Sequence, residues 1–236
     1  PPTGPLAAAT GPADEVDPFI GTGPAQPTAG GSFGSGDVFP GAAAPSPMLA
    51  WSPDTTSPNP GGYSYPDDTI TGFSLTHFSG RGCRYHQDVP IMAVPGEPTA
   101  SPLADPAAFA ARFSHRDESA RPGSYQVRLG TGTSVALAAT TRTGIGEFTF
   151  PAAGGSLVVE AGSGAQGRQD GALAIDPAGR EAAGSTVGRV GCGSEHYTLS
   201  FALRFDGPLT GYGTWAADGV LRPGVTSTAG AGAGGY

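Results

Sequence analysis

Three cationic or titratable residues that suit ligand binding lie close together around a cysteine. Arg81, Arg84 and His86 fall within six residues, on either side of Cys83. An arginine side chain ends in a planar group with paired N–H donors, which suits two-point contact with a phosphate or a carboxylate. The segment therefore predicts binding of a negatively charged group. The alternative, which the sequence leaves open, is that both arginines form ion pairs at the surface or between domains.

The remainder of the chain is acidic and contains no lysine. The 236 residues carry a formal net charge of −8, and all twelve basic residues are arginine. A general nucleic-acid surface needs clustered positive charge, so we expect no nucleic-acid partner. No apolar run approaches the roughly 20 residues of a membrane-spanning helix, so we expect no membrane partner.

Two cysteines, Cys83 and Cys192, permit one disulfide, and two free buried thiols are the alternative. A disulfide between them would indicate an oxidising compartment. The first thirteen residues are small and rich in proline, as expected for a tail left after processing. Together these features predict a secreted, extracellular protein.

Common catalytic signatures are missing from the sequence. It has no G-x-S-x-G, no H-E-x-x-H, no phosphate-binding P-loop and no C-x-x-C pair. The acidic pairs Asp67–Asp68 and Asp117–Glu118 are adjacent in sequence, so we predict surface or turn positions for both. The sequence therefore predicts no catalytic residue and no metal ligand in this chain.

The elements that must position these residues are predicted to be short antiparallel strands. Glycine and proline exceed a quarter of the chain, which indicates many turns. In 196–205, apolar residues alternate with polar ones, as in a half-buried strand. Segments 134–141 and 145–150 flank a turn and predict a hairpin. The pattern predicts an all-β antiparallel sandwich, with one short helical stretch at 107–112 and, at 230–236, either a flexible tail or a further strand.

Several segments in a fixed order carry a resemblance to a known family. They are Asp17–Gly23, Val38–Ala42, Trp51–Thr55, Gly62–Ser74 and Thr76–Cys83, followed by Asp88. Further segments that agree are Phe113–His115, Pro122–Tyr125 and the strand pair around 140–151. In this order they resemble the N-terminal domain of glycoside hydrolase family 92.

The resemblance implies a β-sandwich over 15–236, preceded by a flexible tail at 1–14 and truncated before a larger (α/α) barrel. Members of the family are calcium-dependent, inverting exo-α-mannosidases. Their general acid, general base and most calcium contacts belong to the barrel, so this chain alone is expected to be inactive.

In the family, loops of the sandwich lean over the sugar pocket. The resemblance therefore implies that the substrate is bound by Phe33, Gly34, Arg81, Gly82, Cys83, Arg84, His86 and Asp88. The loop departs from the usual pattern, because Arg81 replaces a threonine and Arg84 follows the cysteine. The family includes members that act on mannose-1-phosphate diester caps, so we expect such a cap on mannan or N-glycans as the substrate here.

A second reading is that the chain is a stand-alone carbohydrate-binding β-sandwich module, which would need no partner domain. A third is a structural secreted sandwich without a site. The concentration of unusual residues between 77 and 88 argues against the third.

Overall fold

The structure is a computed structural model that describes residues 11–23, 36–80, 82–152 and 154–236, together with the backbone of 26–28 and 31–33. Predicted site residues Gly34 and Arg81 and most of the predicted tail lie outside the described residues. The regular elements are the 3₁₀ turns η1 (Pro12–Glu15) and η2 (Pro106–Phe109) and the strands β1 (Gln26–Thr28), β2 (Gly31–Phe33), β3 (Ala42–Ala43), β4 (Ala50–Thr55), β5 (Thr69–Ser74), β6 (Ile91–Pro95), β7 (Ala111–Arg121), β8 (Ser124–Leu129), β9 (Ser134–Ala139), β10 (Gly144–Thr149), β11 (Gly155–Val159), β12 (Ser163–Gly164), β13 (Gly167–Arg168), β14 (Asp170–Asp176), β15 (Glu181–Arg189), β16 (His196–Arg204), β17 (Gly213–Trp215), β18 (Arg222–Pro223), β19 (Ser227–Ala231) and β20 (Gly234–Gly235).

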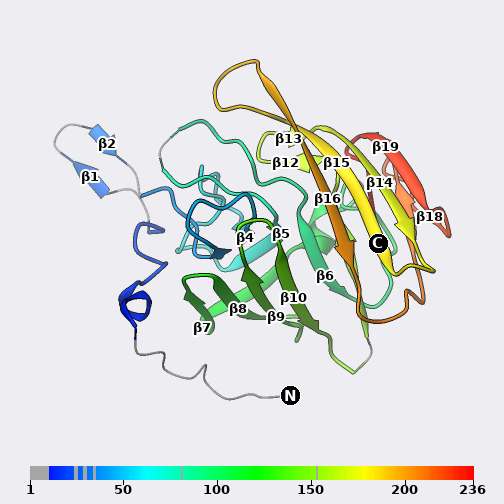
Figure 1. Cartoon of the computed structure of the whole chain (residues 1–236), viewed down its shortest axis with the longest axis horizontal. Helices are drawn as coiled ribbons and strands as arrows, with labels where there is room; N and C mark the ends of the chain where they lie inside the picture. Colours follow the sequence, from blue (N-terminus) through cyan, green and yellow to red (C-terminus); the bar gives the residue numbers. More distant parts are fainter. Residues whose placement is uncertain (1–10, 24–25, 29–30, 34–35, 81, 153) are drawn as a thin grey trace.

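Two antiparallel sheets make up most of the molecule (Figure 1). The larger has twelve strands and runs β10-β9-β8-β7-β5-β6-β11-β20-β17-β18, with β3 and β4 joined to it through β5. The smaller has the order β16-β15-β14-β19. The hairpins β1–β2 and β12–β13 form separate pairs. This architecture confirms the predicted all-β antiparallel sandwich.

In one half of the molecule the large sheet folds back, so that β3 and β4 pack against β8 and β9. Aromatic rings fill the space between these strands. The ring centroids of Trp51 and Phe148 are 6.2 Å apart, and Phe73 contacts both Phe148 and Tyr125 at 6.5 Å. The hairpin predicted over 134–150 is β9–β10, and it supplies Phe148 to this core.

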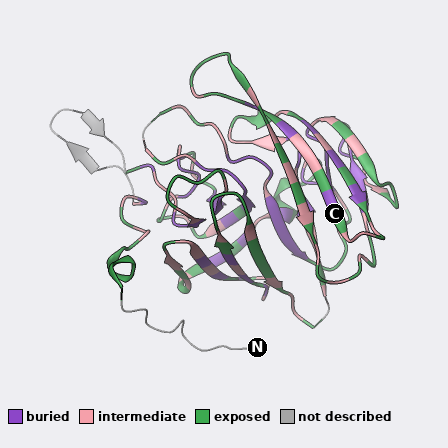
Figure 2. Ribbon diagram, in the orientation of Figure 1, coloured by how far each residue is buried: buried purple, intermediate pink, exposed green. Residues whose placement is uncertain are grey.

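In the other half the small sheet packs against β17 and β20. The residues of β6 from Ile91 to Val94 are all buried, which explains their continuous apolar run (Figure 2). Strand β16 alternates between half-buried and exposed residues along its whole length, as the sequence predicted. Trp215 of β17 is 1% exposed, and its indole nitrogen donates to the Gly232 carbonyl.

One local prediction was wrong, and the structure decides between the two alternatives for the final segment. The helical stretch expected at 107–112 is the 3₁₀ turn η2, after which the chain enters β7 at once. Pro106 suits the first position of such a turn but the segment is too short to sustain a helix. The final segment is not a tail, because it forms the end of β19 and the whole of β20, and residues 232–235 are buried.

The expectation that Glu118 lies at the surface was also wrong. The pairing of β7 with β8 shifts register between Phe113 and Glu118. Such an irregularity re-aims the side chains that follow it. Glu118 consequently points inward, with only 1% of its side chain exposed. Its neighbour Asp117 is exposed, as expected.

Candidate functional site

Residues 77–89, which we call the cysteine loop, connect β5 to β6 and lie beside the hairpin β12–β13. Three hydrogen bonds tie the loop to that hairpin, one of them from the Val89 amide to the Ser163 carbonyl at 3.3 Å. The amide of Ala165 donates to the His86 carbonyl at 2.8 Å, and the Gln166 side chain donates to the Arg84 carbonyl at 2.8 Å.

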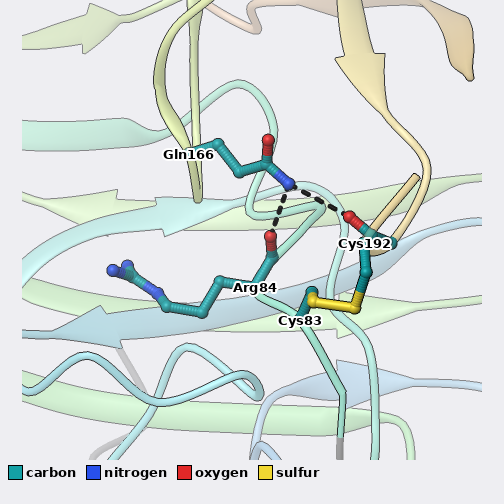
Figure 3. Close-up of a disulfide and its surroundings, with 5 residues drawn as sticks. Cys83, Arg84, Gln166 and Cys192 are labelled. Atoms are coloured by element: carbon teal, nitrogen blue, oxygen red, sulfur yellow. Dashed lines mark hydrogen bonds between the residues drawn. A yellow bond between two sulfur atoms is a disulfide. The ribbon is translucent and has the colours of Figure 1, made fainter. Parts of the chain in front are cut away.

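A disulfide between Cys83 and Cys192 ties the same loop to the turn between β15 and β16 (Figure 3). Gln166 donates to that turn as well, at the Gly191 carbonyl 3.3 Å away. The loop is thereby fastened to elements that lie about a hundred residues further along the chain.

Three residues of the loop other than glycine have left-handed backbone conformations. The φ angles are 64° at His86, 53° at Gln87 and 55° at Val89. Such angles are uncommon outside glycine and are a true outlier for a β-branched residue such as valine. Each costs on the order of 1–3 kcal/mol and persists only where the surroundings impose it. Clusters of this kind occur at functional sites, which makes the loop the first candidate for one.

The buried carboxylate of Asp88 lies between these left-handed residues and ties them to the rest of the fold. Asp88 is completely buried, and side chains from three other segments donate to it. Thr76 donates at 2.7 Å, Tyr197 at 2.6 Å and Gln169 at 2.8 Å. The His86 ring nitrogen Nδ1 lies 3.6 Å from the same carboxylate. Asp88 therefore joins the loop to β16, to the segment that follows β5 and to the residue between β13 and β14.

The balance of burial and hydrogen bonding decides the charge of Asp88. Burial alone would raise its pKa, but the interactions with His86, Thr76, Tyr197 and Gln169 outweigh burial and lower it. Asp88 is therefore ionised at neutral pH. Burial raises the pKa of Tyr197, and the hydrogen bond to Asp88 and its charge raise it further, so the Tyr197 hydroxyl keeps its proton.

The outer side of the loop presents a cation and several rings. Arg84 is exposed, no described residue pairs with its guanidinium group, and its side chain extends away from the disulfide (Figure 3). The rings of Phe78, Tyr85 and His86 follow one another at centroid distances of 4.8 and 4.6 Å. Asp88 is the only carboxylate in the loop and protein donors occupy it, so the arrangement suits ligand binding rather than proton transfer.

The predicted site residues divide into two groups. The structure brings Gly82, Cys83, Arg84, His86 and Asp88 together in the cysteine loop. Gly34 and Arg81 lie outside the described residues, and of Phe33, at the end of β2, only the backbone is described.

The sequence reasoning missed the side chains that hold Asp88. Thr76 lies twelve residues away from it, Gln169 lies 81 away and Tyr197 lies 109 away. Tyr197 was recognised only as part of the inner face of β16. The one available signal was its hydroxyl, since a phenol on a buried face usually needs a hydrogen-bond partner.

A second polar cluster, next to the start of the loop, is structural. Both ring nitrogens of His77 are engaged, Nδ1 by the Ala50 carbonyl at 2.8 Å and Nε2 by Asp54 at 3.0 Å. Ser74 donates to the other oxygen of Asp54. Gly62, at φ 83°, passes so close that a Cβ atom there would lie 2.7 Å from Asp54. With both ring nitrogens engaged, no atom of His77 is left to act as a base, so His77 is a structural histidine.

Among the residues that the structure describes, no group of three or more His, Cys, Asp or Glu side chains is arranged to hold a metal ion. In the same part of the chain, no helix is long and apolar enough to cross a membrane.

Comparison with known proteins adds a family to this geometry. The family model described as the glycosyl hydrolase family 92 N-terminal domain matches residues 15–236. Among curated proteins no sequence matches.

Three solved structures are similar over nearly the whole chain. The family GH92 α-mannosidase BT3965 from Bacteroides thetaiotaomicron is 26% identical, with a TM-score of 0.81, and the match covers 98% of this chain and 31% of that one. The GH92 family glycosyl hydrolase ccman5 is 29% identical, with a TM-score of 0.80 and coverage of 94% and 30%. The inverting mannosidase BT2199 from Bacteroides thetaiotaomicron VPI-5482 is 29% identical, with a TM-score of 0.74 and coverage of 94% and 28%. The chain thus spans about a third of the length of the proteins it matches.

Proposed function

Because this chain belongs to glycoside hydrolase family 92, whose N-terminal domain it contains, we propose that it forms one wall of the sugar pocket of an exo-acting α-mannoside hydrolase. The observation that carries this proposal is the match of the family domain over residues 15–236. Two of the similar structures bear the name mannosidase, and one of them is described as inverting.

The division of labour within such an enzyme follows from the chemistry. Inverting hydrolysis needs two carboxyl groups that flank the scissile bond with room for a water molecule. The cysteine loop offers one carboxylate, and that carboxylate is buried and fully hydrogen-bonded. This supports the proposal that this chain binds the substrate and that a further (α/α) barrel domain of the enzyme supplies the acid and the base.

The finer part of the proposal concerns the charge of the substrate. A neutral sugar does not require an unpaired arginine, whereas a phosphate diester does benefit from one. Arg84 is exposed, without an ion pair to any described residue, on a backbone that the disulfide and Gln166 hold in place. A mannosyl phosphodiester cap of mannan or an N-glycan fits this position better than an uncapped mannoside.

Two further properties complete the proposal. Calcium dependence rests on the family resemblance alone, which implies that the ligands of the ion lie mainly outside this chain. Secretion is supported by the disulfide, because such bonds persist in oxidising compartments.

The test compares two exposed arginines in an intact enzyme that contains this chain. Arg84→Ala is expected to lower kcat/KM for a mannosyl phosphodiester about tenfold or more, and to change kcat/KM for 4-nitrophenyl α-mannoside less than twofold. Arg142→Ala, in the exposed turn between β9 and β10, serves as the control and should change neither. Equal losses on both substrates would remove the argument for a charged substrate, and absence of any mannose release would overturn the proposed enzyme.

A further inference from the structure

We propose that His86 contacts a hydroxyl group of the bound sugar through its outer ring nitrogen, Nε2, and that Tyr197 and Asp88 fix the ring so that Nε2 acts as an acceptor. The inference rests on the proposed function and adds a specificity-determining residue to that pocket. It is carried by the order of hydrogen bonds from Asp88 through Tyr197 to His86.

The direction of the first bond is set by Asp88. The Tyr197 hydroxyl has one hydrogen and lies 2.6 Å from a carboxylate oxygen that can only accept. The hydroxyl therefore donates to Asp88. Thr76 and Gln169 donate to the same carboxylate, so its charge stays in place.

The second bond follows from the first. With its hydrogen used, the oxygen of Tyr197 can only accept from His86, whose Nδ1 lies 3.1 Å away. Nδ1 therefore carries the hydrogen. In a neutral imidazole the other nitrogen, Nε2, then has a free lone pair and accepts hydrogen bonds. None of the described residues bonds to Nε2, and 30% of the side chain is exposed.

The setting of His86 indicates what meets Nε2. The residue has a left-handed backbone conformation, and its carbonyl is held by Ala165. Its ring lies between Tyr85, at 4.6 Å, and Tyr197, at 5.3 Å. An acceptor held rigidly beside the half-buried rings of Tyr85 and Tyr197 suits a sugar hydroxyl, which can donate. It does not suit a phosphate oxygen, which cannot. His86 and Arg84 thus recognise different parts of one substrate.

Two substitutions separate the two ring nitrogens. The side-chain amide of asparagine reaches the position of Nδ1, and that of glutamine reaches the position of Nε2. His86→Asn keeps the inner contact and suits the left-handed backbone, whereas His86→Gln keeps the outer contact. In the intact enzyme His86→Asn is expected to raise KM about tenfold, for 4-nitrophenyl α-mannoside and for a mannosyl phosphodiester alike, with kcat changed less than twofold. His86→Gln is expected to stay within about threefold of the unaltered enzyme.

Tyr197→Phe tests the positioning. It is expected to raise KM about fivefold in the unaltered enzyme but to add nothing in the His86→Gln background, where no ring needs to be oriented. An equal rise in both backgrounds would mean that Tyr197 serves only the fold. Thermal melting of each variant shows whether it is folded.

The matched control uses the other partly exposed histidine that lies beside a buried carboxylate. His115→Asn and His115→Gln are expected to leave KM unchanged. The proposal is overturned if His86→Asn retains the original KM, or if His86→Gln loses as much as His86→Asn. Absence of any turnover by the unaltered enzyme would instead overturn the proposed function.

Discussion

Two carboxylates with buried side chains in this molecule have almost the same surroundings, and we propose different roles for them. The side chains of Glu118 and Asp88 are each 1% exposed, and each has a histidine partner whose side chain is 30% exposed. Each also accepts hydrogen bonds from tyrosine. Tyr63 and Tyr125 donate to Glu118 at 2.9 and 2.5 Å, and Tyr197 donates to Asp88 at 2.6 Å.

The difference lies in how each histidine is held. His115 bonds directly to Glu118 at 2.7 Å, and its ring stacks on Tyr65 with centroids 4.0 Å apart. It belongs to β7, where the backbone is extended. His86 reaches its carboxylate mainly through Tyr197 and has a left-handed conformation on an irregular loop.

The comparison teaches that burial and hydrogen bonds alone do not mark a functional residue. The Glu118 centre holds β7 and β8 to the segment around Tyr63, and nothing about it is strained. The Asp88 centre holds a strained loop whose outer face carries an exposed arginine. Strain that the rest of the fold must compensate is the distinguishing sign. Three predictions test this contrast: one concerns the disulfide, one the two carboxylates, and one a third buried carboxylate.

The largest effect on stability is expected from removal of the disulfide, which lies in the loop of the Asp88 centre and not beside Glu118. Replacing Cys83 and Cys192 together by serine frees a loop of 109 residues in the unfolded chain. The chain-entropy model gives a loss of stability of about 5 kcal/mol. Urea unfolding monitored by fluorescence measures this loss. Amide exchange is expected to speed up in 82–89 and to remain slow in β7 and β8. Uniformly faster exchange in both regions would mean that the disulfide does not act locally.

A smaller effect is expected when each carboxylate is converted to its amide. In Asp88→Asn and in Glu118→Gln, an NH₂ group replaces one carboxylate oxygen. The hydroxyl and amide groups that donated to that oxygen then face another donor. Each change is expected to cost about 3 kcal/mol, because buried donors lose their partner. The cost in free energy should be similar, whereas only Asp88→Asn should raise KM in the intact enzyme. If Glu118→Gln raised KM to the same degree, the contrast between a structural and a functional centre would fail.

The sequence predicted the parts of this picture that depend on local patterns. Alternation identified the inner face of β16, and two cysteines left one possible pairing, which the structure contains. It did not predict that Glu118 is buried, because the register shift in β7 is a property of how β7 pairs with β8. Alternation also assigned Tyr197 to a face without indicating that Asp88, 109 residues away, lies opposite it. Contacts of that range depend on the packing of one sheet on the other, which no local period encodes.

The smallest effect concerns a third carboxylate, Glu160, which follows β11 and has no tyrosine donor. Burial raises its pKa to about 7; a hydrogen bond with Ser163 lowers it in part, and the charge of Asp54 raises it. A raised pKa means that the folded chain binds the proton more tightly than the unfolded chain. The contribution of Glu160 to stability is therefore complete below about pH 4.5 and is lost as the pH rises through 7. Asp88 behaves in the opposite way. Its lowered pKa adds stability above its ordinary value of 3.8, and this stability is lost as the pH falls through the lower pKa of the folded state.

Glu160→Gln consequently provides a test in which pH decides the size of the effect on stability. A shift from 4.5 to about 7 corresponds to at most about 3 kcal/mol, and partial exposure reduces this to about 2 kcal/mol. The substitution is expected to change stability little at pH 4.5 and to stabilise the chain by about 2 kcal/mol at pH 8.5. Urea unfolding at several pH values measures the difference. Asp88→Asn is expected to destabilise the chain at pH 4.5 and at pH 8.5. A gain that did not depend on pH would show that Glu160 is not protonated in the fold. A tyrosine donor would then not be what keeps the Asp88 carboxylate charged, because Glu160, buried without a tyrosine donor, would have kept its charge equally well.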